Sequence, residues 1–437
     1  MDGQPPKRLP EPFPSQYNGK ESIEGAITEA MRWNLVMITL DCVRPDHLGC
    51  YGYRGVETPR LDGLAADGVL FEQAVTVAPN TWVAHATLFT GCLPARHGLR
   101  AASHRISPEV VTLAEWLSGY GFTAAAFPGT SLVGRAQGFH RGFHLFDEKW
   151  QEAGWQVEDV SWRRDWKDSL GRAFEWMEEA PEPFFAWIHY MDTHHLPGCQ
   201  LPEYFRRGFS PRWQFYDGKI SFADQVCVGE ILGLLDRRGL RERTVIVVFS
   251  DHGEELNDDG RPMHDGGLRD DVIRVPMIMG LPSEAGHPGL RVPWQVRLLD
   301  LFPTVCDLMD LSRPQDLQGR SLLPMLRGSS HDGGEDGRLA YLENWPRGLL
   351  GLRTPEWKLI LRHPAPEAWD SAEPRVEGLY HLPTDGGERV DLSWKHPSVV
   401  EYLRAHCLER ARGESPLVMG PEERERVERA LRGLGYL

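Results

Sequence analysis

Three groups of carboxylate and imidazole side chains in this 437-residue sequence directly follow apolar stretches. The apolar stretches cover residues 33–40, 183–190 and 244–249. A further histidine lies in the Asp- and Gly-rich loop beyond the third group. The candidate ligands are Asp41, Asp192, His194, His195, Asp251, His252 and His264. Oxygen and imidazole ligands of this kind suit Zn²⁺ or Mn²⁺, so together they predict a divalent-metal site. An Asp-His pair after a strand, taken alone, is also typical of a turn with a capping carboxylate.

A hydroxyl stands at the start of a predicted helix in residues 80–91. The apolar run Val69 to Val77 indicates a strand that Pro79 ends, and the following helix stops at Gly91. Thr81 is predicted to be the N-cap of this helix. The helix dipole and the unpaired amides would face any anion at that hydroxyl. Thr81 is therefore either a plain helix cap or a nucleophile, depending on its partners.

The elements that must position these residues alternate between strand and helix. Predicted strands cover residues 33–40, 69–77, 122–127, 183–190, 244–249 and 275–279, and predicted helices cover 59–66, 107–119, 166–177, 223–235 and 298–311. This alternation predicts an α/β fold with a largely parallel central sheet covered on both faces. Carboxylates at the carboxyl ends of buried strands lie where α/β enzymes bind ligands.

The pattern changes from about Gly351. Short strand-like pieces at 357–361 and 378–382 are followed by charged helices, which predicts a smaller C-terminal subdomain with an antiparallel sheet. We expect an N-terminal tail at 1–30, a catalytic domain at 31–345 and a C-terminal subdomain at 346–437.

Composition narrows the partners. The chain carries 48 Lys and Arg against 63 Asp and Glu, and a net charge of −15 argues against nucleic-acid or anionic-membrane binding. No apolar run reaches the roughly 20 residues that span a bilayer. Seven scattered cysteines indicate reduced thiols, and no signal segment is visible, so we expect a cytoplasmic protein. The oligomeric state is left open.

The sequence resembles the sulfatase branch of the alkaline phosphatase superfamily over most of its length. The motifs that carry the resemblance are residues 38–52, 58–62, 81–91 with Pro94 and His97-Gly98, 192–194, 250–254, His264 ahead of 274–276, 300–304, 319–322 and 379–380. The resemblance implies an alkaline-phosphatase-like three-layer α/β/α fold. It also implies a small-molecule phosphate or sulfate ester as the substrate.

The resemblance further implies how the centre would be built. Asp41, Asp251 and His252 would bind one metal together with the Thr81 oxygen, which would make Thr81 the nucleophile. Zn²⁺ or Mn²⁺ is expected, with Ca²⁺ or Mg²⁺ as the other choices.

A second site is implied in the members that bind two metals. It would consist of Asp192, His194 or His195, and His264, and its metal would polarise the leaving oxygen. With a single metal, His194 and His264 would instead donate hydrogen bonds to the substrate.

Two departures from the family pattern bear on the substrate. Sulfatases carry a Cys or Ser in a Cys-x-Pro-x-Arg context that is oxidised to formylglycine. Here Thr81, which cannot become that aldehyde, takes this place, and His85 stands where the Arg would be. Cys42 replaces the second carboxylate of the usual Asp-Asp pair. Both changes favour a phosphohydrolase, acting on a mono- or diester or a phosphonate ester, with a covalent Thr81 intermediate.

Residues 92–96 are nevertheless a literal match to the formylglycine motif, with Cys92 in the reactive place. A nucleophile there would lie a whole helix, roughly 15 Å, from Thr81. One alternative is therefore an arylsulfatase-like enzyme that uses oxidised Cys92. Another is a non-catalytic family member that acts as a binding protein.

Weaker expectations concern three charged residues. Arg44 and Asp46 either support the metal ligands or form a salt-bridged loop. Lys358 either contacts an anionic substrate or is a solvated strand residue.

Overall fold

The computed structural model of the chain describes residues 33–148, 166–194, 213–256, 262–263, 266–329, 339–364, 372–412, 420 and 425. The predicted tail at 1–30 and the two candidate ligands His195 and His264 lie outside the described residues.

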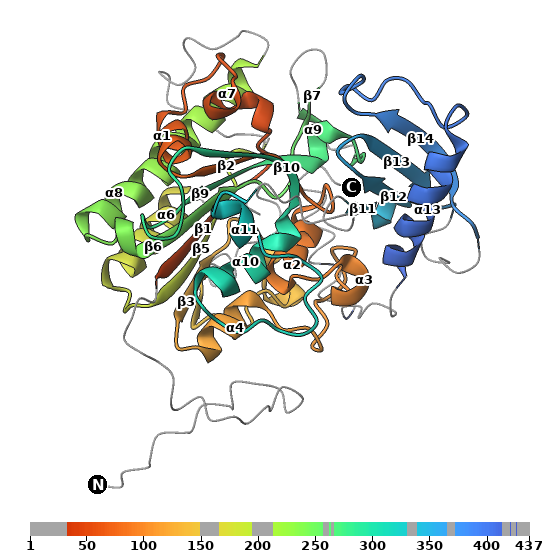
Figure 1. The fold of residues 1–437 in the computed structure, drawn as a ribbon. Helices are drawn as coiled ribbons and strands as arrows, with labels where there is room; N and C mark the ends of the chain where they lie inside the picture. Colours follow the sequence, from red (N-terminus) through yellow and green to blue (C-terminus); the bar gives the residue numbers. More distant parts are fainter. Residues whose placement is uncertain are drawn as a thin grey trace, which may run out of the picture.

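An eight-stranded sheet forms the centre of the molecule (Figure 1). Its order is β10 (Leu290–Arg297), β2 (Val69–Val75), β9 (Arg274–Gly280), β6 (Thr244–Phe249), β1 (Asn34–Leu40), β5 (Phe184–Tyr190), β3 (Thr123–Phe127) and β4 (Leu145–Phe146). Neighbouring strands are parallel except where β9 pairs with β2 and β6. The prediction of a largely parallel sheet is confirmed.

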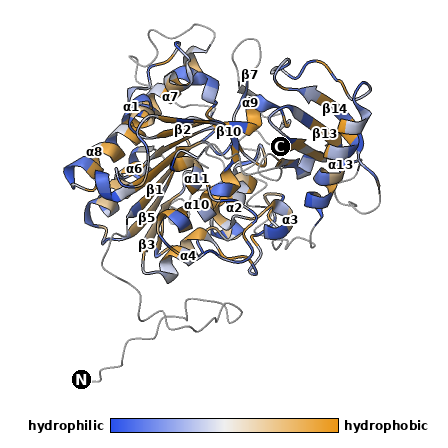
Figure 2. Cartoon of the chain, viewed as in Figure 1, coloured by the Kyte–Doolittle hydropathy of each residue, from blue (hydrophilic) through white to orange (hydrophobic). Residues whose placement is uncertain are grey.

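The sheet is buried on both faces because its central strands are apolar throughout. Every residue of β1, β5 and β6 is buried, and successive side chains of a strand point to opposite faces. Leu35 and Met37 therefore join one apolar cluster, whereas Val36 and Ile38 join another. Figure 2 shows the hydrophobic residues concentrated along these strands.

Helices cover both faces and give the three layers. Buried residues of α2 (Thr81–Thr90), α4 (Leu113–Gly119) and α10 (Leu301–Leu308) belong to the first cluster. Those of α1 (Pro59–Asp67), α6 (Trp166–Glu179) and α8 (Glu230–Arg237) belong to the second. Other elements of this part are α3 (Pro94–His97), α7 (Gln214–Ala223), α9 (Asp270–Ile273), α11 (Leu323–Leu326), β7 (Glu255–Leu256) and β8 (Pro262–Met263). The three-layer α/β/α fold is thus confirmed.

Several element boundaries differ from the predictions. The helix expected from residue 107 begins only at Leu113, because Thr112 and Glu115 form a reciprocal capping box there. The helix expected at 223–235 is split by a π-helical segment, Asp224–Gly229. Strand β10 was not predicted, since Pro293 interrupts its pattern. The strand tolerates this proline because it lies at the sheet edge and its pairing with β2 shifts register between Val292 and Gln295.

A second, antiparallel sheet lies in the C-terminal part. Its strands in order are β11 (Ala340–Asn344), β12 (Leu349–Arg353), β13 (Trp357–Arg362) and β14 (Arg375–His381), and α13 (Pro397–Ala411) lies against it. The predicted antiparallel C-terminal sheet is confirmed, and it begins at Ala340.

Buried ion pairs join this sheet to the main layers. Lys358 is fully buried, and its Nζ lies 2.5 Å from Asp270 and 2.7 Å from Glu388. Both interpretations offered for Lys358 from the sequence are therefore wrong, since it is neither solvated nor open to a substrate. Arg100 pairs with Glu343 in the same manner.

Among the described helices, none is both long enough and apolar enough to cross a membrane.

Candidate active site

The parallel strands β1, β5 and β6 bring the predicted ligand groups to one edge of the sheet. Thr39 is level with His189 of β5 and with Phe249 of β6. The ladder continues one residue further, where the amide of Asp41 donates to the carbonyl of Tyr190 at 3.1 Å. The loops that follow the three strands therefore start side by side, as the sequence predicted.

The carboxylates of Asp41 and Asp251 meet the imidazole of His252 at this edge. One ligand atom from each of the three lies within 4.8 Å of the others, and all three side chains are buried. The Nδ1 atom of His252 donates to the Gly253 carbonyl at 2.9 Å, so its Nε2 atom is turned toward Thr81. The distance from that Nε2 to the Thr81 Oγ1 is 3.2 Å. The structure thus brings together the four residues expected at the first metal.

Thr81 is the first residue of α2, and Asn80 is the N-cap. The prediction that Thr81 itself caps the helix is therefore wrong by one residue. Its hydroxyl contacts His252 across the site, so it is directed toward the metal ligands. The helix ends as predicted, because Gly91 adopts the left-handed conformation with φ 62°.

The carboxylate of Asp251 tests whether a metal fits. Both of its oxygens are buried and have no hydrogen-bond partner. The nearest imidazole nitrogens are those of His252, at 3.6 Å, and His85, at 3.8 Å. Burying a carboxylate without partners is strongly unfavourable, and a divalent cation would satisfy it. With the Asp41 oxygens and the His252 nitrogen beside it, the set suits Zn²⁺ or Mn²⁺.

Electrostatics around the centre also favour a cation. Burial raises the pKa of Asp41, and burial raises the pKa of Glu254 well above its usual range. Burial alone would lower the pKa of His252, but the carboxylates of Asp251 and Asp41 raise it overall. The buried carboxyl groups of Asp41, Asp251 and Glu254 thus share a site of low polarity, where positive charge is stabilised.

His189 is a member of the centre that sequence reasoning missed. Its Nε2 donates to the second carboxylate oxygen of Asp41 at 2.9 Å, while its Nδ1 is buried without a hydrogen-bond partner. It lies inside β5, where the pattern predicted only a buried strand. In the sheet, His189 of β5 is paired with Thr39 of β1, which lies two residues before Asp41 in the chain. This strand register is the signal that could have found His189.

His85 lies on the buried side of Thr81. Its Nδ1 donates to the Thr81 carbonyl at 2.8 Å, and its Nε2 accepts from the Thr39 hydroxyl at 3.1 Å. The Trp187 indole donates in turn to the Thr39 oxygen at 3.2 Å. Burial lowers the pKa of His85 to about 3. This side chain is therefore a neutral, fixed hydrogen-bonding group in the place where the family pattern has an arginine.

The structure describes two residues of the second predicted ligand set, Asp192 and His194. A ring nitrogen of His194 lies within 4.8 Å of ligand atoms of Asp41 and Cys42. Asp192, although buried, belongs to no such group of three among the described residues, and His264 lies outside them. His194 therefore lies beside Asp41 and Cys42.

Arg44 and Asp46 form the salt-bridged loop that was one of the two expectations. The Arg44 guanidinium contacts both Asp46 oxygens, at 2.9 and 2.7 Å, and donates to the Glu254 carbonyl at 3.1 Å. Both residues line a cavity of about 870 Å³, to which Trp213 and Trp294 also contribute. This cavity adjoins the loops that carry the centre.

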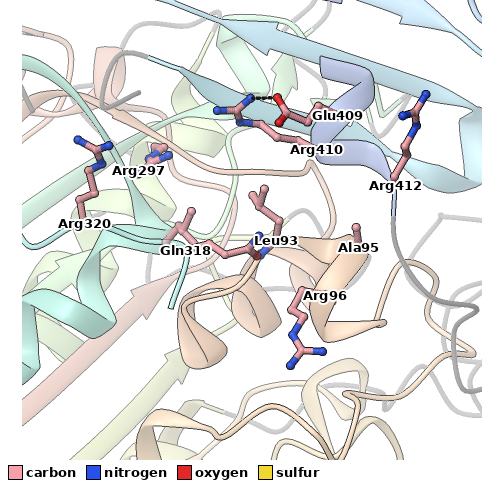
Figure 3. Close-up of a pocket in the computed structure, with 10 residues that line it drawn as sticks. Leu93, Ala95, Arg96, Arg297, Gln318, Arg320, Glu409, Arg410 and Arg412 are labelled. Atoms are coloured by element: carbon pink, nitrogen blue, oxygen red, sulfur yellow. Dashed lines mark hydrogen bonds and ion pairs between the residues drawn. The ribbon is translucent and has the colours of Figure 1, made fainter. Parts of the chain in front are cut away.

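Cys92 lies beyond the other end of α2. It is buried, its Sγ donates to the Asp316 carbonyl at 3.5 Å, and burial raises its pKa to about 12. The ten-residue helix between Thr81 and this end is roughly 15 Å long. The following residue, Leu93, lines a different cavity of about 550 Å³, shown in Figure 3. Five arginines contribute to its lining: Arg96, Arg297, Arg320, Arg410 and Arg412.

The fold and the site define an alkaline-phosphatase-like α/β protein. The sequence profile of the family described as Sulfatase matches residues 33–311, well over half of the chain. A second profile, described as N-sulphoglucosamine sulphohydrolase, C-terminal, matches residues 259–390. This chain belongs to the sulfatase family, which confirms the resemblance.

Curated relatives are distant but extensive. An ulvan-active sulfatase of Formosa agariphila is 26% identical over 337 residues, which cover 68% of this chain and 66% of that protein. A second one from the same organism is matched over 55% of its length, so the chain spans less than two thirds of either. Human arylsulfatase A is 25% identical over 472 residues, which cover 90% of this chain and 91% of that protein.

Solved structures share the fold. The phosphonate monoester hydrolase of Agrobacterium radiobacter superposes with a TM-score of 0.71 at 21% identity, covering 87% of this chain and 95% of that one. A protein solved with its substrate D-glucosamine-2-N,6-O-disulfate gives a TM-score of 0.68 at 16% identity, with 86% and 97% covered. At these identities the likeness is one of architecture.

The comparisons correct one prediction. Thr81 led us to expect phosphate esters ahead of sulfate esters, but the matching family and the curated relatives named here are sulfatases. They favour the substrate class of the alternative, in which a sulfatase uses oxidised Cys92, over the phosphate ester of the main prediction.

Proposed function

We propose that this chain is a metal-dependent hydrolase of sulfate esters that acts at Asp41, Thr81, Asp251 and His252. One observation carries the proposal: the buried, partnerless carboxylate of Asp251 and the Thr81 hydroxyl at the start of α2 both lie against the Nε2 atom of His252. Membership of the sulfatase family supports the substrate class. Thr81 remains the proposed nucleophile because its hydroxyl, and not the Cys92 thiol, lies at the ligand group.

A divalent cation held by Asp41, Asp251 and His252 would supply Lewis-acid chemistry to the hydroxyl and to the ester oxygens. The Thr81 oxygen attacks sulfur, and the bond from sulfur to the alcohol oxygen breaks. The alcohol leaves with a proton, and the amides of the first turn of α2 face the charged oxygens of the transferred group. Water then attacks sulfur and releases sulfate and the free hydroxyl. The sum is one ester and one water giving one alcohol and one sulfate ion with its proton.

We assign the remaining ligands and the rest of the substrate as follows. His264 stays a proposed contact of the ester oxygens, and His194 a proposed metal ligand. The alcohol portion would occupy the 870 Å³ cavity, where Trp294 is 40% exposed. An exposed indole with neighbouring arginines and carboxylates suits a polar ring such as a carbohydrate.

A phosphate or phosphonate ester is the second candidate. It is favoured by Thr81 itself, because an ordinary hydroxyl replaces the aldehyde of the formylglycine enzymes. The two substrate classes share the same centre and differ in the charge and the reactivity of the transferred group, so rates measured side by side separate them.

The experiment compares 4-nitrophenyl sulfate, 4-nitrophenyl phosphate and a phenylphosphonate monoester with protein loaded with Zn²⁺ or Mn²⁺. We expect sulfate turnover to be the fastest. Thr81→Ala should lower it by roughly 10³-fold or more, whereas Cys92→Ala, a matched change at the other end of α2, should leave it nearly unchanged. An active Thr81→Ala protein with an aldehyde at Cys92 in its intact mass would overturn the assignment of the nucleophile. Absence of turnover on all three esters would favour a binding protein.

A further inference from the structure

Cys42 is held in an unusual conformation beside the centre. Its φ of 59° lies in the left-handed region, which residues other than glycine rarely adopt. The residue is fully buried, and its Sγ donates to the Asp41 Oδ1 at 2.8 Å. The same sulfur lies 3.7 Å from the Nδ1 of His252. Strain of this kind persists where the surroundings fix it, and it is concentrated at functional sites.

The thiol belongs to a group of three ligand types. Ligand atoms of Asp41, Cys42 and His194 lie within 4.8 Å of one another, and all three side chains are buried. His194 is fixed there because Lys219, itself buried, donates to its backbone carbonyl at 2.6 Å. Asp41 is shared with the first ligand group, whose member Asp251 has both oxygens buried and without a hydrogen bond. Two ligand groups therefore adjoin at one carboxylate.

The chemistry of the group selects among metals. A sulfur, an imidazole nitrogen and a carboxylate oxygen suit Zn²⁺ and Co²⁺, whereas Ca²⁺ and Mg²⁺ prefer sites built from oxygen alone. A metal ligand must be the thiolate, so binding replaces the proton that Cys42 shares with Asp41. The carboxylate oxygen of Asp41 that loses this proton would be available to the same ion.

We propose that Cys42, together with Asp41 and His194, binds a thiophilic divalent cation through its thiolate, next to the ion of the proposed function. This deepens the proposed function, because it names the metal class of that centre and makes Asp41 a ligand common to both groups. Cys42 is thus a metal ligand rather than a buried thiol that only fills space.

The test is the absorption spectrum of the metal-free full-length protein titrated with Co²⁺. A thiolate bound to Co²⁺ gives a charge-transfer band in the near ultraviolet, so we expect this band to grow with the added metal. Cys42→Ser should abolish it. The matched changes Cys306→Ser and Cys407→Ser, at two other buried cysteines, should retain it. His194→Gln should weaken Co²⁺ binding by about 10-fold or more.

Cys42→Asp guards against a variant that fails to fold, because it keeps a ligand at the position. It should lose the band, retain Mn²⁺ binding and reduce the preference for Zn²⁺ over Mn²⁺ by at least tenfold. A band that persists in folded Cys42→Ser, or wild-type protein saturated with Co²⁺ without a band, would overturn the proposal. A Cys42-dependent band in protein that hydrolyses no ester would uphold the ligand and reject the proposed function. Ester turnover by protein that shows no band would uphold the proposed function and reject Cys42 as a metal ligand.

Discussion

The imidazole of His85 donates a hydrogen bond to the backbone carbonyl of Thr81, at 2.8 Å and wholly out of contact with solvent. Thr39 and Trp187 extend this contact into a chain that ends in the first core cluster. Because the Nδ1 atom of His85 donates to Thr81 and its Nε2 atom accepts from Thr39, the ring has a single tautomer and orientation. Its role in the centre is to position the first turn of α2.

His85→Ala should therefore lower kcat while leaving KM nearly unchanged, since the Thr81 oxygen would be misplaced without loss of substrate contacts. A decrease of about 10- to 100-fold is expected. Steady-state kinetics with 4-nitrophenyl sulfate measure it. Trp187→Phe removes only the indole at the far end of this series of hydrogen bonds, so its decrease in kcat should be severalfold smaller. Equal effects on kcat in the two variants would argue against an ordered chain.

Strand ends could be predicted from the sequence, whereas contacts between elements could not. Asp41, Asp251 and His252 each follow an apolar run, so their shared edge needed only the rule for parallel sheets. His189 escaped notice because its importance depends on the register that places it level with Thr39. Lys358 was misjudged because the alternating polar and apolar pattern of a strand does not show that another part of the chain covers the outer face of that strand. Thr81 lies at the ligand group, as the sequence predicted. Its identity as a threonine led to the ester class that the relatives favour less.

His189 should control the affinity of the centre for metal. Its hydrogen bond to Asp41 orients the carboxylate of a proposed metal ligand. Hydrogen bonds of this kind to a metal ligand typically contribute 10- to 100-fold to the affinity for the metal. We expect His189→Phe to weaken Zn²⁺ binding by about that factor in a competition titration. His144→Phe, a change at a histidine that contacts Ala124 instead, is the control. Unchanged affinity in His189→Phe would remove His189 from the centre.

Metal removal should destabilise the protein, because Asp251 then keeps a buried carboxylate without a partner. Metal at 100 times its Kd would stabilise the fold by about 2.7 kcal/mol. Thermal melts with and without a chelator measure the difference.

Asp251→Asn separates the stabilisation by bound metal from the cost of burying the carboxylate without a partner. The variant should be insensitive to the chelator. In metal-free form it should melt above the wild type, since it buries no charge. A metal-free Asp251→Asn protein that melts below the metal-free wild type would contradict this account of the carboxylate.

The C-terminal sheet should detach first in acid, because its contact with α9 depends on Asp270. Burial alone would raise the pKa of this carboxyl, but Lys358 and Arg353 hold it well below its ordinary value. A depressed folded pKa means that the stabilisation is complete above the unfolded value of about 3.9 and is lost as the pH falls through the folded value. Asp270→Asn should therefore destabilise the fold by about 3 kcal/mol or more near pH 7, where it leaves Lys358 less compensated. The difference from wild type should shrink below about pH 4. Urea unfolding across this pH range measures the effect, with Asp67→Asn, an exposed change at the end of α1, as the control. A destabilisation that stays constant from pH 7 to pH 3 would show that Asp270 contributes through packing rather than through its charge.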